Sequence, residues 1–71
     1  MVRAFIGSAE CRVSVDRDLG DNWAVTVYPP PRGKVPVPSH VVKLQGNDRE
    51  AAVRGALEIL QRAGSIDRFE L

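Results

Sequence analysis

Two runs in which apolar and polar residues alternate, with a cluster of turn-forming residues between them, constrain the fold of this chain more than any other feature. Residues 9–17 and 23–28 both follow this period of two, which puts the apolar side chains of a strand on one face. The segment between them, residues 18–22, reads Asp-Leu-Gly-Asp-Asn and is typical of a turn. We therefore expect an antiparallel hairpin whose apolar residues face a common core. These residues are Cys11, Val13, Val15, Trp23, Val25 and Val27.

Residues 29–39 interrupt this pattern and contain all five prolines of the chain. Because proline has no backbone N–H to donate to a central ladder, the segment is predicted to be a long, stiff connection that blunts a sheet edge. No two of its prolines are three residues apart. It therefore lacks the PxxP element that docks in the grooves of domains that bind proline-rich peptides.

Strand character returns after the prolines. Residues 40–45 alternate again, with Val42 and Leu44 expected to face the core and Val41 to face outward. Residues 2–6 are expected to supply a further edge strand. The sheet is thus predicted to have three to four antiparallel strands.

The amphipathic segment after residue 46 predicts a helix. Asn47 is a favourable N-cap, Glu50 three residues later completes the pattern of a capping box, and Gly64 fits the position just past the helix end. At about 100° per residue, the apolar residues share one side and Gly55 lies on the polar side. The apolar residues are Ala52, Val53, Ala56, Leu57, Ile59, Leu60 and Ala63. The sequence therefore predicts a single two-layer α+β domain over residues 1–71, with one C-terminal helix on one sheet face.

The scarcity of reactive residues removes several classes of function. The single cysteine, Cys11, allows no internal disulfide, and together with the single histidine, His40, it cannot supply four ligands to a structural zinc ion. Turn chemistry accounts for Asp16, Asp18 and Asp21 without a metal. No nucleophile motif or phosphate-binding glycine loop is present. We expect no catalysis, no cofactor and no metal.

The charge balance and the apolar runs bear on the cell compartment. Ten basic and nine acidic residues give a net charge of +1, which makes no case for a membrane surface or for a strongly basic nucleic-acid-binding domain. No apolar run approaches the roughly 20 residues that span a bilayer, and the N-terminus is too short for the plan of a signal peptide. We expect a small cytoplasmic protein of bacterial type.

Two surfaces stand out as candidate sites for a protein partner or for a second copy of the chain. One is the sheet face that the helix leaves uncovered. The other is the apolar C-terminal tail, residues 65–71, for which two placements stay open: on its own core or on a second copy. A chain of this size buries only about 60% of its unfolded surface, so association is a favourable way to complete the core. The candidate residues are Thr26, Tyr28, Val41, Ile66, Phe69 and Leu71.

A local charge asymmetry supports an alternative site. No acidic residue lies between Asn22 and Asn47, whereas several basic residues lie there or on the uncovered face. Such residues beside Tyr28 suit a phosphate backbone with one stacked base. The candidate residues for nucleic acid are Arg12, Arg32, Lys34 and Lys43.

Residues 11–63 resemble the N-terminal domain of HicB-like antitoxins. In that family an aromatic residue opens the second strand, as Trp23 does here, and a glycine, a polar cap and a Glu-Ala pair open the helix, as in residues 46–51. The family's connection between the second and third strands is short, whereas residues 29–39 are long. The resemblance implies a small dimerising or partner-binding module.

The order of three strands and a helix is also similar to the C-terminal part of a double-stranded-RNA-binding domain. That domain has a first helix before its strands, for which residues 1–7 are too short. The favoured hypothesis is therefore a non-catalytic protein-binding or self-associating module with an antitoxin-like role. The alternative is a weak nucleic-acid-binding protein.

Overall fold

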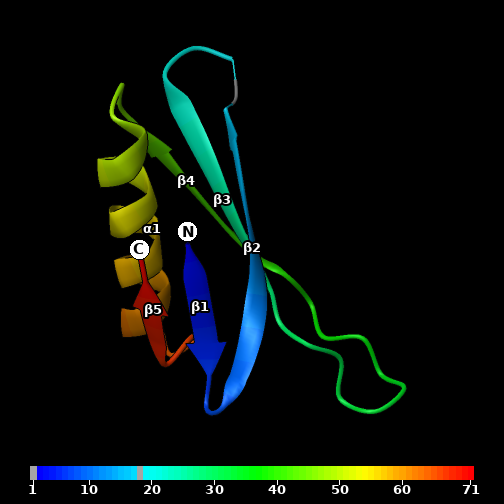
Figure 1. Ribbon diagram of the computed structural model, residues 1–71. Helices are drawn as coiled ribbons and strands as arrows, with labels where there is room; N and C mark the ends of the chain where they lie inside the picture. Colours follow the sequence, from blue (N-terminus) through cyan, green and yellow to red (C-terminus); the bar gives the residue numbers. More distant parts are fainter. Residues whose placement is uncertain (1, 18) are drawn as a thin grey trace.

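The described part of the chain forms one curled antiparallel sheet with a single helix against it (Figure 1). The computed structural model describes residues 2–17 and 19–71. Within them the strands lie in the order β4-β3-β2-β1-β5. The elements are β1 (Arg3–Ile6), β2 (Ala9–Arg17), β3 (Asn22–Tyr28), β4 (His40–Gln45), α1 (Arg49–Arg62) and β5 (Arg68–Glu70). The α+β class and the single C-terminal helix are confirmed.

The strand β2 joins the two halves of the sheet. Its first residues pair with β1, in the register Ala4 opposite Cys11, and the rest pair with β3, in the register Val13 opposite Val27. The β2–β3 hairpin is the one that the alternating runs predict. Its turn includes residue 18, which lies outside the described residues.

The predicted number of three to four strands is wrong, because the tail forms a fifth strand. Within residues 65–71, β5 pairs antiparallel with β1, and Phe69 lies opposite Ala4. Three residues are too few to show a period of two. This strand exists because it completes a ladder with residues more than 60 positions away, a contact that local sequence does not reveal.

The tail folds back on its own chain, which settles its placement between the two alternatives. The amide of Asp67 donates to the Phe5 carbonyl at 2.8 Å, and its carboxylate accepts from the Gly7 amide. Ile66 is only 1% exposed and belongs to the core, so it is not available to a partner. The core is formed by Ala4, Cys11, Val25, Val27, Val53, Ala56, Leu57, Leu60 and Ile66.

The two ends of α1 are capped differently from each other. Asp48, and not Asn47, is the N-cap, and its carboxylate accepts from the amides of Glu50 and Ala51. The predicted capping box is therefore wrong by one position, since Glu50 becomes the second helical residue. At the other end Gly64 has φ of 80°, as predicted for the residue past the helix end.

The last turn of α1 is a complete Schellman motif. The amide of Gly64 donates to the Gln61 carbonyl at 3.1 Å, and the amide of Ser65 donates to the Leu60 carbonyl at 2.9 Å. This turn reverses the chain directly after α1. It thereby places Ile66 in the core and leads into β5.

Gly55 marks the closest approach of α1 to the sheet. A Cβ atom at this position would lie 3.0 Å from Cδ1 of Leu44 in β4. The prediction that placed Gly55 on the polar side is therefore wrong. Absence of a side chain lets α1 lie against β4 at this point, which offsets the roughly 1 kcal/mol that a glycine costs in a helix.

Residues 29–39, here called the proline arm, project from the sheet between β3 and β4 (Figure 1). Near its tip, Arg32 and Val35 exchange two backbone hydrogen bonds of 3.0 and 3.1 Å around a two-residue turn. Gly33 has φ of 60° at the first central position, which a turn of type II′ requires.

The position of Ile66 makes a prediction for stability. Ile66→Ala leaves a cavity where α1 meets the sheet, so we expect a loss of about 2–5 kcal/mol in the free energy of unfolding. Urea denaturation measures it. Leu71→Ala is the control, since Leu71 is exposed beyond β5. A loss below about 1 kcal/mol for Ile66→Ala would contradict the assigned core.

Candidate functional site

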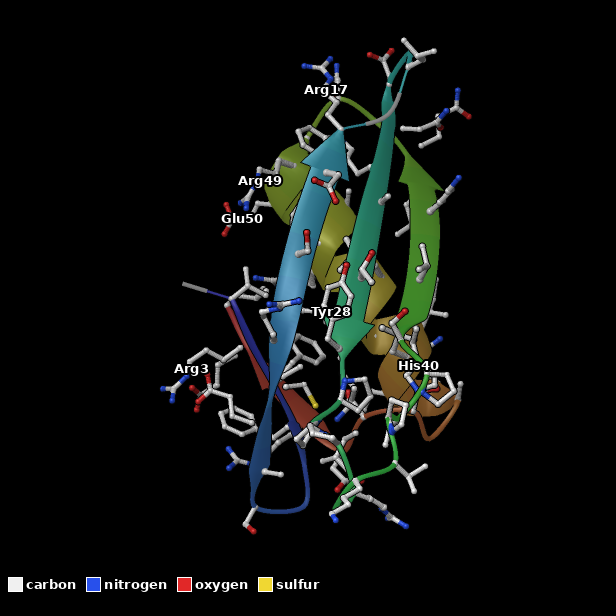
Figure 2. All side chains as sticks on the ribbon, turned by 90° about the vertical axis from the view of Figure 1, so that its right-hand side faces the viewer. Arg3, Arg17, Tyr28, His40, Arg49 and Glu50 are labelled. Atoms are coloured by element: carbon white, nitrogen blue, oxygen red, sulfur yellow. The ribbon has the colours of Figure 1, made fainter. Side chains whose placement is uncertain are left out.

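The sheet face opposite α1, here called the outer face, gathers three of the predicted partner-binding residues. Ladder partners lie on one face, and Thr26 is opposite Ser14 on β2 and Val41 on β4. Tyr28 lies two residues along β3 from Thr26, on the same face. Figure 2 views the sheet with α1 behind it and shows Tyr28 among these strands. The exposed fractions are 8% for Thr26, 37% for Tyr28 and 52% for Val41.

The ring of Tyr28 is already stacked by an arginine. Arg12 is its ladder partner, and the guanidinium carbon lies 4.6 Å from the ring centroid. Such a cation–π contact contributes about 0.5–1 kcal/mol at an exposed site. A base that stacked on Tyr28 would have to displace Arg12 from the ring or approach its other side.

A second stack of arginines and an aromatic ring lies on the β5–β1–β2 part of the outer face. The guanidinium carbons of Arg68 and Arg3 lie 4.1 and 5.4 Å from the centroid of the Phe5 ring, which is buried as a result. Arg3 also pairs with Glu10 at 2.8 Å and with Glu70 at 3.7 Å. These arginines serve the fold, because they cover an aromatic ring on the face of the sheet away from α1.

The sequence carried a signal for one part of this stack, which was overlooked, and none for the other part. Arg3 and Phe5 are two residues apart, a spacing that places both on one strand face and was a usable signal. Arg68 gave no such signal, because only the pairing of β5 with β1 brings it opposite Phe5.

The four residues predicted to contact nucleic acid do not form one patch. Arg32 and Lys34 flank Gly33 in the proline arm. Arg12 lies on the sheet, and Lys43 lies four ladder pairs, about 13 Å, farther along the strand direction. Lys43 shares its ladder row with Asp16 across Ala24, which lowers the positive charge there.

Phe69 and Leu71, the other two residues of the predicted tail site, have different surroundings. Phe69 is half-buried against the core on the side of the sheet that carries Ala4. Leu71 is exposed past the end of β5. With Ile66 in the core, residues 65–71 do not present one apolar surface.

An open pocket of about 630 Å³ lies between the proline arm and the β1–β2 hairpin. Ile6 and Ala9 form one wall, and the other wall is made almost entirely of proline and valine side chains of the arm. Arg32 is the charged residue among those that line it. The pocket is therefore an apolar surface and offers no constellation for catalysis.

Potential metal ligands and the thiol show no arrangement for chemistry. Among residues 2–17 and 19–71, no group of three or more His, Cys, Asp and Glu side chains could hold a metal ion. Cys11 is buried in the core, and this burial raises the pKa of its thiol. A raised pKa leaves little of the nucleophilic thiolate at neutral pH.

Comparisons with known proteins identify no relative. No protein-family model, curated protein or solved structure matches the chain. Within the part of the chain that the structure describes, no helix combines the length and the apolar character that crossing a membrane requires.

The buried thiol makes a prediction for reactivity. We expect a thiol reagent at pH 8 to modify Cys11 on the order of a hundredfold more slowly in the native protein than in denaturant, because the thiol must first be exposed. Absorbance of the released chromophore measures the rate. A variant with Cys11→Ala and Ser8→Cys carries an exposed thiol in the β1–β2 turn and is the control. Equal native rates for both proteins would contradict the burial.

The Arg3–Glu10 pair makes a prediction for the pH dependence of stability. The hydrogen bond from Arg3 lowers the pKa of the Glu10 carboxyl. A lowered folded pKa gives stability above the ordinary pKa of Glu, about 4.3, that is lost as the pH falls through the folded value. We expect Glu10→Gln to flatten the fall in melting temperature below about pH 4.3. Parallel profiles for the two proteins would contradict it.

Proposed function

We propose that the chain is a small non-catalytic binding module that recognises a protein through its outer face. The observation that carries this proposal is the contiguous group of Thr26, Tyr28 and Val41 on a sheet face that no helix of the described residues covers. Tyrosine is enriched in protein interfaces because its ring is large, rigid and able to donate a hydrogen bond. Val41 adds an exposed apolar side chain beside it.

The charges on the outer face favour a protein over a nucleic acid. Arg3 and Arg68 are held by acidic neighbours and by the Phe5 ring, and Arg12 is stacked on Tyr28. A phosphate backbone needs cations that gather along its path. The resemblance to HicB-like antitoxins supports the same class of function, in which the module regulates a protein partner.

We expect removal of the Tyr28 ring to weaken capture of the partner. Tagged wild-type protein and Tyr28→Ala are used in parallel on nuclease-treated extracts of the native cells, with quantitative mass spectrometry of what is retained. The expected result is a protein retained in near-stoichiometric amount by the wild type and reduced at least about tenfold by Tyr28→Ala, which corresponds to about 1.4 kcal/mol.

The control removes an exposed apolar side chain outside the outer face. Leu19→Ala, in the turn between β2 and β3, should retain the partner as the wild type does. Equal retention by all three proteins would contradict the role of the outer face. Retention that disappears with nuclease would instead support the nucleic-acid alternative through Arg12, Arg32, Lys34 and Lys43.

A further inference from the structure

The strand β4 forms a free edge of the sheet with backbone groups turned outward. The Gly46 amide donates to the Asp21 carbonyl at 2.7 Å, so this pair is a hydrogen-bonded pair of the antiparallel ladder with β3. Hydrogen-bonded pairs alternate along such a ladder. The backbone amides and carbonyls of Val41 and Gln45, at odd positions, therefore point away from β3. Such an edge is a template for another strand.

The flank of α1 beside this edge is apolar. α1 contacts β4 where Gly55 meets Leu44. The chain reverses between β4 and α1, so Ile59, one turn after Gly55, lies on the same stripe toward the start of β4. Ile59 is 46% exposed, and Val42 and Leu44 beneath it are only half-buried. The apolar layer between helix and sheet is thus incomplete along β4.

Two opposite charges border Ile59 on the same flank. Glu58 precedes it and Arg62 follows it, one turn apart, and both are exposed. Within residues 2–17 and 19–71 neither makes an ion pair. The flank therefore presents one acid and one base, in a fixed order along the helix, with an apolar residue between them.

We propose that the occupant of this edge is a second copy of the chain, paired through β4 about a two-fold axis. This proposal goes beyond the proposed function, because it concerns the β4 edge and not the group around Tyr28 on the outer face. A separate strand alone would cover β4 but leave Ile59 exposed, whereas a second copy supplies a strand and a helix together. The two-fold axis reverses the helix direction and sets Glu58 opposite the partner's Arg62, and Arg62 opposite the partner's Glu58.

The charge of Lys43 selects the register of the pairing. The two-fold axis keeps both helices on one side of the sheet, so only residues of the same face meet. If the axis crosses the strand pair at Lys43, the two Lys43 side chains lie directly opposite each other, and like charges in this position are destabilising. If it crosses at Val41, Leu44 lies opposite the partner's Pro38. An axis at Val42 avoids both arrangements, sets Val41 opposite the partner's Lys43, and brings the two Ile59 side chains toward the axis.

The first test is the mass of the protein in solution. Light scattering over a concentration series is expected to give twice the 7.8 kDa of one chain. Val41→Pro removes an amide that points away from β3, so the ladder to β3 is kept while pairing of the edge is blocked. We expect this variant to be a folded monomer by circular dichroism. A wild-type protein that stays monomeric at about 1 mM would overturn the proposal.

The second test uses the two charges and does not depend on the backbone. Glu58→Arg sets like charges together across the axis and should raise the dissociation constant of the dimer at least about tenfold. Adding Arg62→Glu to this variant should restore the dissociation constant of the wild type. The matched control is Glu50→Arg with and without Arg54→Glu, a pair of the same spacing two turns nearer the start of α1, and should leave the constant unchanged. A dimer unaffected by Glu58→Arg would overturn the proposed interface.

The failure of this inference and that of the proposed function give different results. Tyr28 lies on β3, away from the edge, so Tyr28→Ala should change capture of a protein partner and leave the mass unchanged. If the protein is monomeric but Tyr28→Ala still weakens capture, the second copy is wrong and the outer-face function stands. If the charge swap behaves as expected while Tyr28→Ala has no effect, the β4 dimer stands without the outer-face function.

Discussion

The burial of Ile66 between α1 and the sheet is the interaction on which the rest of this structure depends. A chain of 71 residues has little apolar surface to bury, and the sheet and helix alone leave the end of the core uncovered. The Schellman turn at Gly64 directs Ile66 into that end and starts β5. β5 then pairs with β1 on the side opposite β2. One side chain therefore couples the helix end to the N-terminal strand.

The outer face shows how a two-layer protein of this size treats the side of its sheet that has no helix. Phe5 is covered by two guanidinium groups, and Tyr28 by one. Arginine stems and planes cover aromatic rings while their charged ends remain in water or pair with acids. The face is therefore partly shielded by its own side chains. What remains exposed and apolar is concentrated toward β4, at Val41.

The two edges of the sheet are not equivalent, which gives the molecule a direction for association. β5 is three residues long and carries two charged side chains, of which Glu70 pairs with Arg3 and with Arg68. β4 is six residues long and has a half-exposed apolar layer between it and α1. The proline arm ends just before β4 and leaves residues 40–45 free of proline. Short length and charged side chains protect the β5 edge from pairing with another strand. The β4 edge has less of both kinds of protection.

The sequence by itself determined the elements whose signal lies within a few neighbouring residues. The period of two defined β2, β3 and β4, the amphipathic pattern defined α1, and Gly64 marked the position past its end, because side-chain direction follows from local backbone geometry. The tertiary structure decided the rest. It made β5 a strand, turned Gly55 toward Leu44, put Ile66 in the core and moved the N-cap to Asp48. It also separated the basic residues that sequence reasoning had grouped. The N-cap follows from hydrogen bonds that Asp48 accepts within the first turn of α1. The other outcomes depend on contacts between segments far apart in the chain, and a local pattern carries no information about them.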